Sequence, residues 1–514
     1  MDAQFFKAED FQLILPQVQL GLFALGILLT DFLLEPRYKY WNAGMAMLGV
    51  FFSGLTLVGL PAGIGRFLER IGLGRFRMPG LRGLVALRGD QIGFNGSLLV
   101  DPFFIFFGAL FLAATALVIL LSVRYLEIEA EHHGEYYALM LFATIGMMFM
   151  ASGLDIVVQF VALETMAISF YVLAGFLRND RRSNEGALKY VLLGAFSSGI
   201  LAYGFSIMYG VAGSTNLVDI ANAFGRRPPT DILVLLSLVT VSAGLFFKVA
   251  AVPFHQWAPD VYEGAPTSIT AYVSVASKTA SFALLLRLFL SAFWPTRVNW
   301  VMILAGVAVA SMTIGNLAAI TQTNLKRLLA YSSISHVGYI LLGLVAGNET
   351  GLQGMAFYLF VYAFMNTGAF AIIILLRRQG LIGDELDDLK GLIQRSPGAA
   401  VLLLLFLLSL AGIPPTAGFL GKYYIFLSLI ETGHYWLAVF AVLYIVPAVY
   451  YYFRLIVNAF MREPADPVRP TISLGQAVAL SVTGFVALVA GIYPEPFVRL
   501  ATYSLFMPFG PLGR

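Results

Sequence analysis

The stretch from Phe246 to Lys278, FFKVAAVPFHQWAPDVYEGAPTSITAYVSVASK, decides the fold, because it puts a lysine at each end of a segment that otherwise reads as membrane. Pro253 lies inside it, and a proline removes a backbone hydrogen bond from a helix. We therefore predict a broken helix between Lys248 and Lys278. The rest of the chain has to explain why an apolar segment carries these two lysines.

The chain as a whole has the composition of an integral membrane protein. Of its 514 residues, 59% are hydrophobic and only 12% are charged, whereas about 25% charge is typical of soluble domains. Apolar runs of about 20 residues, enough to cross a bilayer as helix, recur from Phe11 to Val498. We predict an all-α polytopic membrane protein with about 14 transmembrane helices, near residues 12–34, 41–63, 101–123, 136–152, 154–177, 186–210, 231–255, 267–295, 299–320, 327–346, 352–377, 398–428, 435–460 and 474–493.

The charged loops predict the orientation in the membrane. The amino terminus, MDAQFFKAEDFQ, lacks the positive region of a cleaved signal peptide, so the first span is expected to stay in the mature protein. Loops after odd-numbered spans carry more lysine and arginine than the others, although the arginine-rich stretch 64–88 narrows the difference. The positive-inside rule then places both termini outside the cytoplasm. The arginine-rich stretch itself is interpreted as an interfacial segment or as a contact for a neighbour or anionic lipid.

Several kinds of chemistry are excluded by residue usage. The chain has no cysteine, which rules out disulfides and cysteine-ligated iron–sulfur clusters. Of five histidines, only His255 and His336 lie within or beside predicted spans, too few to ligate two haems in pairs. No phosphate loop or dinucleotide fingerprint occurs. We expect no cofactor and no metal in this chain, and no nucleic acid among its partners.

The apolar part of the sequence contains an internal repeat. Residues 170–196 align without a gap to residues 338–364, at a constant shift of 168 residues. The identical pairs are Tyr171/Tyr339, Leu173/Leu341, Gly175/Gly343, Gly186/Gly354, Tyr190/Tyr358, Ala195/Ala363 and Phe196/Phe364. The copies are five spans apart, and an odd number of spans reverses the direction of the chain through the membrane.

A proline-interrupted span follows each copy: VAAVPFHQWAPD in span 7 and AGIPPTAGFLGK in span 12. Inverted repeats with discontinuous helices are how many transporters build an ion path. We therefore predict two inverted five-helix repeats, spans 4–8 and 9–13. The division is 1–135 for spans 1–3 with the arginine-rich loop 64–98, 136–295 for the first repeat, 299–460 for the second, and 461–514 for span 14 and the tail.

Charged residues inside predicted spans are the candidate functional residues. A lysine at a helix centre costs roughly 2.5–3.5 kcal/mol on the insertion scale, so Lys248, Lys278 and Lys422 need a reason to be there. Glu164 is the clearest carboxylate inside a span. Lys189 and Arg287 lie near span ends, where pairing with a carboxylate or reaching the interface explains them at least as well.

Buried lysines and carboxylates suit proton transfer. Burial disfavours a charged lysine and a nearby carboxylate favours it, so moving the carboxylate's influence away releases the proton. Glu164 and Lys248 are the candidate switchable pair, with Lys278 receiving the proton and Lys422 delivering it. His255 and His336 are candidate relays because imidazole titrates near neutral pH, and Lys189 is a further candidate.

Four segments carry a resemblance to a known family: residues 248–278, 163–210, 324–343 and 407–426, which end in VASK, IMYG, ILLG and YYIF. They resemble the antiporter-like proton-channel subunits of respiratory complex I, over spans 4–13. VPFHQWAPDVYEGAP and the lysine of GFLGK are similar to the N type, the homologue of mitochondrial subunit 2. LPQ at 15–17 and the length of the 64–88 stretch depart from that type.

The resemblance implies a proton-translocating membrane-arm subunit of an NADH-quinone or ferredoxin-quinone oxidoreductase. It makes Glu164, Lys248, Lys278 and Lys422 the proton-transfer residues. FMN, iron–sulfur clusters and quinone would belong to other subunits. The implied partners are an M-type antiporter-like subunit, a small multi-span subunit and the lateral helix of an L-type subunit, in a lipid bilayer. The implied location is the bacterial inner (plasma) membrane or a thylakoid-type membrane.

Two other classes stay open at this stage. A cation/proton antiporter subunit of the same fold would exchange Na⁺ or K⁺ for H⁺ and would depend on a specific cation. A structural scaffold would tolerate loss of the buried lysines.

Overall fold

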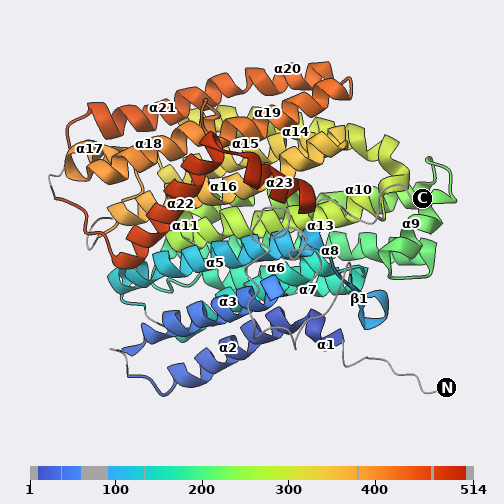
Figure 1. Cartoon of the computed structure of the whole chain (residues 1–514), viewed down its shortest axis with the longest axis horizontal. Helices are drawn as coiled ribbons and strands as arrows, with labels where there is room; N and C mark the ends of the chain where they lie inside the picture. The colour runs from blue at the N-terminus through green and yellow to red at the C-terminus, as the bar shows by residue number, and fades with distance from the viewer. Residues whose placement is uncertain are drawn as a thin grey trace, which may run out of the picture.

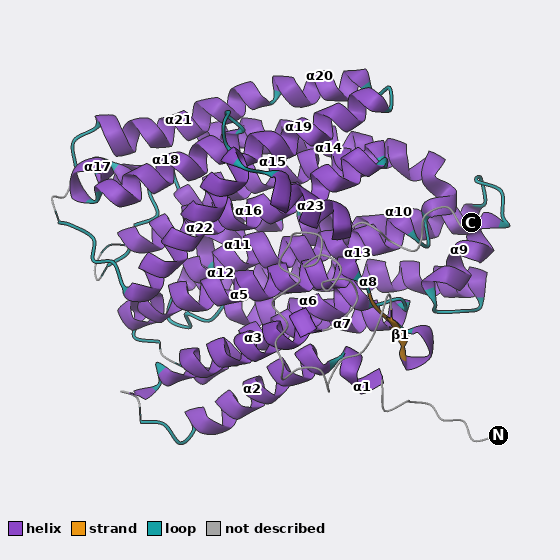
Figure 2. Ribbon diagram, in the orientation of Figure 1, coloured by secondary structure: helices purple, strands orange, loops and turns teal. Residues whose placement is uncertain are grey.

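The fold is a bundle of helices that run close to parallel along the long dimension of the molecule (Figure 1). The computed structural model describes residues 10–35, 38–59, 91–131, 133–378, 381, 383–464 and 468–504. Apart from one short hairpin, the described chain is helix and connecting loop (Figure 2). This agrees with the predicted all-α class.

The elements have the following bounds. The α-helices are α1 Asp10–Leu13, α2 Leu15–Asp31, α3 Trp41–Gly59, α5 Pro102–Glu129, α6 Gly134–Ser152, α7 Ile156–Ala174, α8 Arg181–Ala212, α9 Leu217–Gly225, α10 Ile232–Val249, α11 Trp257–Gly264, α12 Thr267–Tyr272, α13 Lys278–Leu290, α14 Arg297–Thr321, α15 Leu325–Ala346, α16 Glu349–Leu376, α17 Leu392–Arg395, α18 Pro397–Ala411, α19 Ala417–Glu431, α20 Tyr435–Leu443, α21 Ile445–Met461, α22 Leu474–Ile492 and α23 Glu495–Ser504. Shorter turns are η2 Phe94–Gly96, η3 Val273–Ser277, η4 Trp294–Thr296 and η5 Leu386–Leu389, of which η3 is a π-helical turn. Strands β1 Gln91–Gly93 and β2 Leu98–Val100 pair antiparallel.

Twelve helical segments in the described part of the chain are long and apolar enough to cross a membrane. Each of the fourteen predicted ranges overlaps a helix. The two ranges beyond the twelve correspond to α2, with 17 residues, and to α18 with α19, of 15 residues each. The number fourteen stays a prediction.

The sequence interpretation did not include every element. The hairpin β1–β2 and the amphipathic helices α9 and α23 were not predicted. The hairpin forms the end of the predicted arginine-rich loop 64–98; residues 64–90 of that loop lie outside the described residues. α9 and α23 have 9 and 10 residues, about half the length of a span, so apolar runs of span length do not indicate them.

Side-chain caps fix where several of the long helices begin. The Asp101 carboxylate accepts a hydrogen bond from the Phe104 amide at 2.8 Å, and Pro102 occupies the first turn of α5. Asn324 caps α15 by accepting from the amides of Lys326 and Arg327. The first amides of a helix have no partner within the helix, so these caps satisfy donors that apolar surroundings would leave unpaired.

The two predicted helix breaks are present. α10 ends at Val249 and α11 begins at Trp257, while α18 ends at Ala411 and α19 begins at Ala417. The residue that caps the first half of each broken helix is left-handed: Ala250 has φ 59° and Gly412 has φ 81°.

Backbone groups freed by the first break find partners in neighbouring segments. The Val252 amide donates to Ser311 Oγ at 3.0 Å, and Trp257 Nε1 donates to the Phe247 carbonyl at 2.9 Å. Unwound backbone inside a membrane protein needs such partners, because lipid offers none.

The most enclosed helices lie at the centre of the bundle. The segment Thr267–Leu290, which contains α12, η3 and α13, is entirely buried, and the apolar windows of α15 and α16 are each 94% buried. In Figure 1 the helices α2 and α3 form one edge of the molecule and α20 forms the opposite edge. Polar side chains on the central helices are therefore shielded from lipid on every side.

Helix pairing is compatible with two related sets. α6 packs against α7 as α14 packs against α15, and α8 contacts both halves of its broken partner, α10 and α11, as α16 contacts α18 and α19. The inverted relation of the two sets and the domain boundaries 1–135, 136–295, 299–460 and 461–514 stay predictions.

Candidate functional site

The three candidate lysines are buried on three different segments. Lys248 lies in the last turn of α10, Lys278 at the start of α13 and Lys422 in the second turn of α19. Their exposed fractions are 5%, 3% and 1%. None of them reaches the surface with its charged end, so each ammonium depends on partners inside the protein.

Lys248 is paired with Glu164 of α7 through a serine. Lys248 Nζ lies 3.7 Å from Glu164 Oε1. Ser198 of α8 donates to the same carboxylate oxygen at 2.5 Å and accepts from Lys248 Nζ at 3.3 Å. The Glu164 side chain is 24% exposed and that of Lys248 is 4% exposed. Glu164 is thus partly accessible at the protein surface, whereas Lys248 is enclosed.

The position of Lys248 follows from the break in its helix. α10 stops one residue later, so the ammonium is carried by the last turn, where unpaired carbonyls make the helix end partly negative. Lys248 Nζ also donates to the Tyr171 hydroxyl at 3.4 Å and lies 5.8 Å from the centre of the Tyr171 ring. Both features favour the charged form in a buried place.

Lys278 has hydroxyl and aromatic partners. Its ammonium donates to Ser333 Oγ of α15 and lies 5.6 Å from the centre of the Tyr262 ring. The Tyr362 hydroxyl of α16 donates to the same Ser333 Oγ at 2.9 Å. Among the described residues, none of the ion pairs includes Lys278. Lys278 therefore differs from Lys248 in having no carboxylate beside it.

The turn before Lys278 is held by an amide. Asn366 Nδ2 of α16 donates to Ser274 Oγ in the π-helical turn η3 at 2.9 Å and to the Tyr362 hydroxyl at 3.1 Å. π-helical turns are often found at functional sites. Thr279 and Ser281, which follow Lys278 on α13, donate to carbonyls of the preceding turn η3 at 2.7 and 2.8 Å. Their hydroxyl protons are therefore occupied in helix packing.

His336 of α15 continues the polar line beyond Lys278. One ring nitrogen, Nδ1, lies 2.7 Å from the Tyr358 hydroxyl, and the other, Nε2, lies 3.1 Å from the Tyr452 hydroxyl. The His336 ring is 5.4 Å from the Tyr362 ring, centre to centre. Both nitrogens are thus hydrogen-bonded to groups that can donate or accept a proton.

Lys422 is held at the second helix break. Its Nζ donates to the carbonyls of Leu410 and Ala411, at 3.2 and 3.1 Å. These carbonyls are at the end of α18, where no intrahelical donor remains for them. Nζ also lies 4.6 Å from the centre of the Tyr339 ring. The broken helix thus supplies the acceptors that a buried ammonium requires.

Aromatic residues fill the space between Lys248 and Lys278. The Tyr171 and Tyr190 rings are 4.7 Å apart, and Tyr190 stacks on Trp257 at 4.6 Å. Trp257 in turn lies 6.5 Å from the Tyr262 ring, which has the Lys278 ammonium beside it. These contacts connect the surroundings of the two lysines.

The structure brings together five of the seven predicted site residues: Glu164 with Lys248 at one end, and Lys278, His336 and Lys422 across α13, α15 and α19. The other two lie apart. Lys189 forms ion pairs with Asp260 at 2.7 Å and Glu185 at 2.9 Å, with its side chain 42% exposed. His255 lies in the unwound segment between α10 and α11, with its Nδ1 buried and unpaired.

Sequence reasoning left two buried ion pairs unidentified: it allowed Arg287 a carboxylate partner without naming Asp101, and it did not consider Lys326. Arg287 forms two hydrogen bonds to the Asp101 carboxylate, at 2.7 and 2.6 Å, and both side chains are fully buried. Lys326 donates to the Ala265 carbonyl at 3.1 Å and lies 4.0 Å from Asp384. For Lys326 the signal was the cap residue Asn324, which starts α15 earlier than the predicted span 327–346.

No group of three or more His, Asp or Glu side chains that could hold a metal ion occurs in the part of the chain that the structure describes. The site is thus an array of titratable side chains, hydroxyls and helix ends. Such an array is suited to holding and moving protons.

Comparison with known proteins gives relatives along nearly the whole chain. Residues 153–446 match the family model described as NADH:quinone oxidoreductase/Mrp antiporter, TM. Over 506 residues the chain is 56% identical to NADH-quinone oxidoreductase subunit N 2 of Solibacter usitatus, covering 98% of this chain and 99% of the relative.

Solved structures share the fold. A chain of respiratory complex I from Thermus thermophilus is 30% identical, with a TM-score of 0.76, and the match covers 95% of this chain and 99% of that chain. A chain of the Mrp complex from Dietzia sp. is 22% identical, with a TM-score of 0.75, covering 95% of this chain and 96% of that chain. At 22% identity, the match to the Mrp chain shows a shared fold and nothing more.

Proposed function

The chain belongs to the family of NADH-quinone oxidoreductase subunit N, and we propose that it is a proton-translocating membrane-arm subunit of such an oxidoreductase. The observation that carries the proposal is the buried array of Lys248, Lys278, His336 and Lys422, with one carboxylate, Glu164, at its end. An array of this kind costs stability in a membrane protein and calls for a functional reason.

Glu164 and Lys248 are proposed as the switchable pair. A carboxylate beside a buried ammonium increases its affinity for its proton, and loss of that influence decreases it. Ser198 bonds to both groups, so a small shift of α7 against α8 and α10 would change the strength of the pair. This supports a role in coupling movement of helices to proton release.

Lys278 is proposed as the central acceptor and Lys422 as the donor to the far side. Lys278 has a serine and a tyrosine ring beside it, and Lys422 has two carbonyls and a tyrosine ring. His336 lies one turn along α15 from Ser333, the partner of Lys278. Its two tyrosine partners support a relay through the imidazole. Lys189 and His255 are kept as weaker relay candidates.

Electron transfer is proposed to take place in other subunits. The chain has no cysteine thiolate to ligate an iron–sulfur cluster. FMN, the clusters and quinone would then be held elsewhere, with quinone reduction supplying the free energy for proton transfer here. The chain would be a non-redox part of the enzyme.

The proposed surroundings follow the family. An M-type antiporter-like subunit, a small multi-span subunit and the lateral helix of an L-type subunit are the proposed neighbours, in a bacterial inner or thylakoid-type membrane. Both termini are proposed to lie outside the cytoplasm, as the distribution of lysine and arginine predicts.

Affinity purification through a tag on this chain, followed by reconstitution, tests the proposal. The tagged chain is expected to bring down redox subunits, and the vesicles should acidify on quinone reduction equally well in sodium, potassium or choline buffer. A chain that purifies without redox subunits and exchanges protons only for Na⁺ or K⁺ would instead be a cation/proton antiporter.

A further inference from the structure

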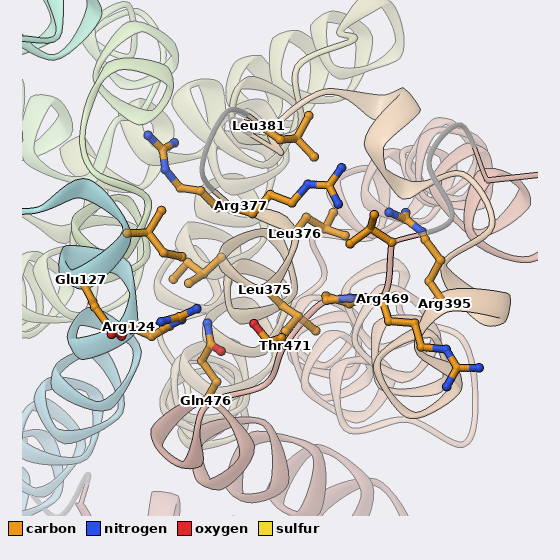
Figure 3. A pocket seen from close by; sticks show the side chains of 15 residues that line it. Arg124, Glu127, Leu375, Leu376, Arg377, Leu381, Arg395, Arg469, Thr471 and Gln476 are labelled. Atoms are coloured by element: carbon orange, nitrogen blue, oxygen red, sulfur yellow. Dashed lines mark hydrogen bonds and ion pairs between the residues drawn. The ribbon is translucent and has the colours of Figure 1, made fainter.

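A cavity of about 550 Å³ is lined by residues that do not belong to the lysine array (Figure 3). Its lining includes five arginines and one carboxylate: Arg124, Arg377, Arg378, Arg395, Arg469 and Glu127. They come from the end of α5, the end of α16, the loop segment with α17, and the loop that leads into α22. Segments far apart in sequence thus bring a cluster of positive charge to one place.

The cavity lies at the level where membrane spans end. α5 ends at Glu129 and α16 at Leu376, and α22 begins at Leu474; all three are apolar enough to cross a membrane. Because the lining residues come from these ends, the cavity faces the zone that polar lipid headgroups occupy. Its lining also includes aliphatic side chains, among them Ile128 and Ile374.

The positive charge is only partly neutralised. Arg124 pairs with Glu127 at 2.7 Å, and Arg377 pairs with Glu129 outside the cavity lining. Arg469 is exposed and takes part in no ion pair within the described part of the chain. The lining therefore has five arginines and one carboxylate, and Arg469 among them has no ion-pair partner in the described residues.

Arg395 gives an independent indication that the cavity suits an anion. One of its terminal nitrogens donates to the carbonyls of Asp388 and Lys390, while its Nε is buried without an acceptor. Burial holds the pKa of this guanidinium below its ordinary value and the charge of Arg378 lowers it further, while the Asp388 carboxylate opposes both in part. A buried donor without a partner is costly, and an anion in the cavity would supply both the acceptor and the charge.

We propose that this cavity binds the phosphate of an anionic lipid headgroup, with the acyl chains lying along the aliphatic side chains at its rim. Arginine suits phosphate because its planar fork of donors matches the phosphate oxygens. Basic pockets between transmembrane helices at the membrane surface are a known type of lipid site. The aliphatic side chains in its lining favour a lipid over free phosphate.

Native mass spectrometry of the assembled, delipidated complex tests the proposal with added phosphatidylglycerol, phosphatidylcholine or inorganic phosphate. Phosphatidylglycerol should bind this subunit at a concentration at which the other two do not. Arg469→Glu should raise the half-saturating concentration by about tenfold, since it replaces one charged hydrogen bond by a repulsion. The matched control is Arg499→Gln on α23, an exposed arginine that pairs with Glu495 at 2.6 Å.

A photoreactive phosphatidylglycerol then locates the site. Its crosslinks should fall in residues 124–128, 374–378 and 468–476 in the wild type and in Arg499→Gln, and be lost in Arg469→Glu. Arg124→Gln is the second variant, in case Arg469→Glu disturbs assembly, and it should weaken crosslinking in the same peptides. Equal binding of phosphatidylcholine, competition by inorganic phosphate alone, or unchanged crosslinks in both variants would overturn the proposal.

Discussion

The Lys422 ammonium lies 4.6 Å from the centre of the Tyr339 ring, and this contact has a counterpart elsewhere in the chain. Tyr171, which corresponds to Tyr339 in the predicted repeat, has the Lys248 ammonium 5.8 Å from its own ring centre. The tyrosines are 168 residues apart, but the lysines are 174 apart. Lys248 precedes its helix break, whereas Lys422 follows its own. Equivalent tyrosines thus meet lysines that come from opposite sides of a break.

The ring of Tyr339 is expected to matter more than its hydroxyl. A cation–π contact of a desolvated lysine is worth about 2 kcal/mol or more, whereas the hydroxyl donates one bond, to the Ala441 carbonyl at 3.0 Å. Tyr339→Leu should therefore lower proton pumping more than Tyr339→Phe, by about thirtyfold at this energy. The measurement is acidification of vesicles per assembled complex. Equal losses in both variants would assign the effect to the hydroxyl.

Glu164→Gln and Lys248→Arg should both impair proton pumping, but for different reasons. Glu164→Gln keeps the bond to Ser198 but removes the charge, so pumping should fall by about tenfold or more while assembly survives. Lys248→Arg keeps the charge, but a guanidinium does not release its proton at working pH. Pumping should fall there as well, and quinone reduction should slow with it in both variants. Wild-type pumping in either assembled variant would count against the switch.

Lys278 should be needed for transfer and not for assembly. Its partners are Ser333 and the Tyr262 ring, with no carboxylate left unpaired when the lysine is removed. Lys278→Ala should therefore block pumping in a complex that still assembles, and Lys278→Met should do the same while filling more of the space. Proton uptake is measured against the amount of subunit retained in the membrane. A scaffold role would predict normal pumping in both.

The buried pair of Asp101 and Arg287 should act on stability instead. Breaking such a pair by removing one partner costs about 3–5 kcal/mol, because a charge is left buried alone. Arg287→Met should therefore lower the thermal inactivation midpoint strongly, and Asp101→Asn added to it should restore part of the loss. Asparagine also keeps the cap of α5. A double variant that is no better than Arg287→Met would show that the pair is not the cause.

The sequence predicts those features that have a local cause. Apolar runs of span length predicted the helices, and Pro253 and the Pro414–Pro415 pair predicted the breaks. The free-energy cost of burying a charge indicated Lys248, Lys278 and Lys422. Pairings between segments could not be predicted. That Ser198 lies between Glu164 and Lys248 depends on how three helices are rotated, and that Arg287 meets Asp101 depends on contacts across 186 residues.

The second helix break allows the position of Lys422 to be tested by a matched pair of glycines. Gly412 and Gly433 are both left-handed, with φ 81° and 78°. A side chain there costs about 1–2 kcal/mol in backbone strain at either position. They differ in their surroundings: a Cβ at Gly412 would come within 2.9 Å of Lys422 Cδ, whereas at Gly433 it would meet nothing within 4 Å.

Gly412→Ala should therefore displace the lysine, and Gly433→Ala should not. We expect both variants to lose similar thermal stability, because the strain is shared. Only Gly412→Ala should also lose proton pumping, because Lys422 would move away from the carbonyls of Leu410 and Ala411 that hold it. Pumping and inactivation midpoint are measured on the same preparations. If Gly412→Ala pumps as well as Gly433→Ala, the placement of Lys422 at the end of α18 is not what proton transfer requires.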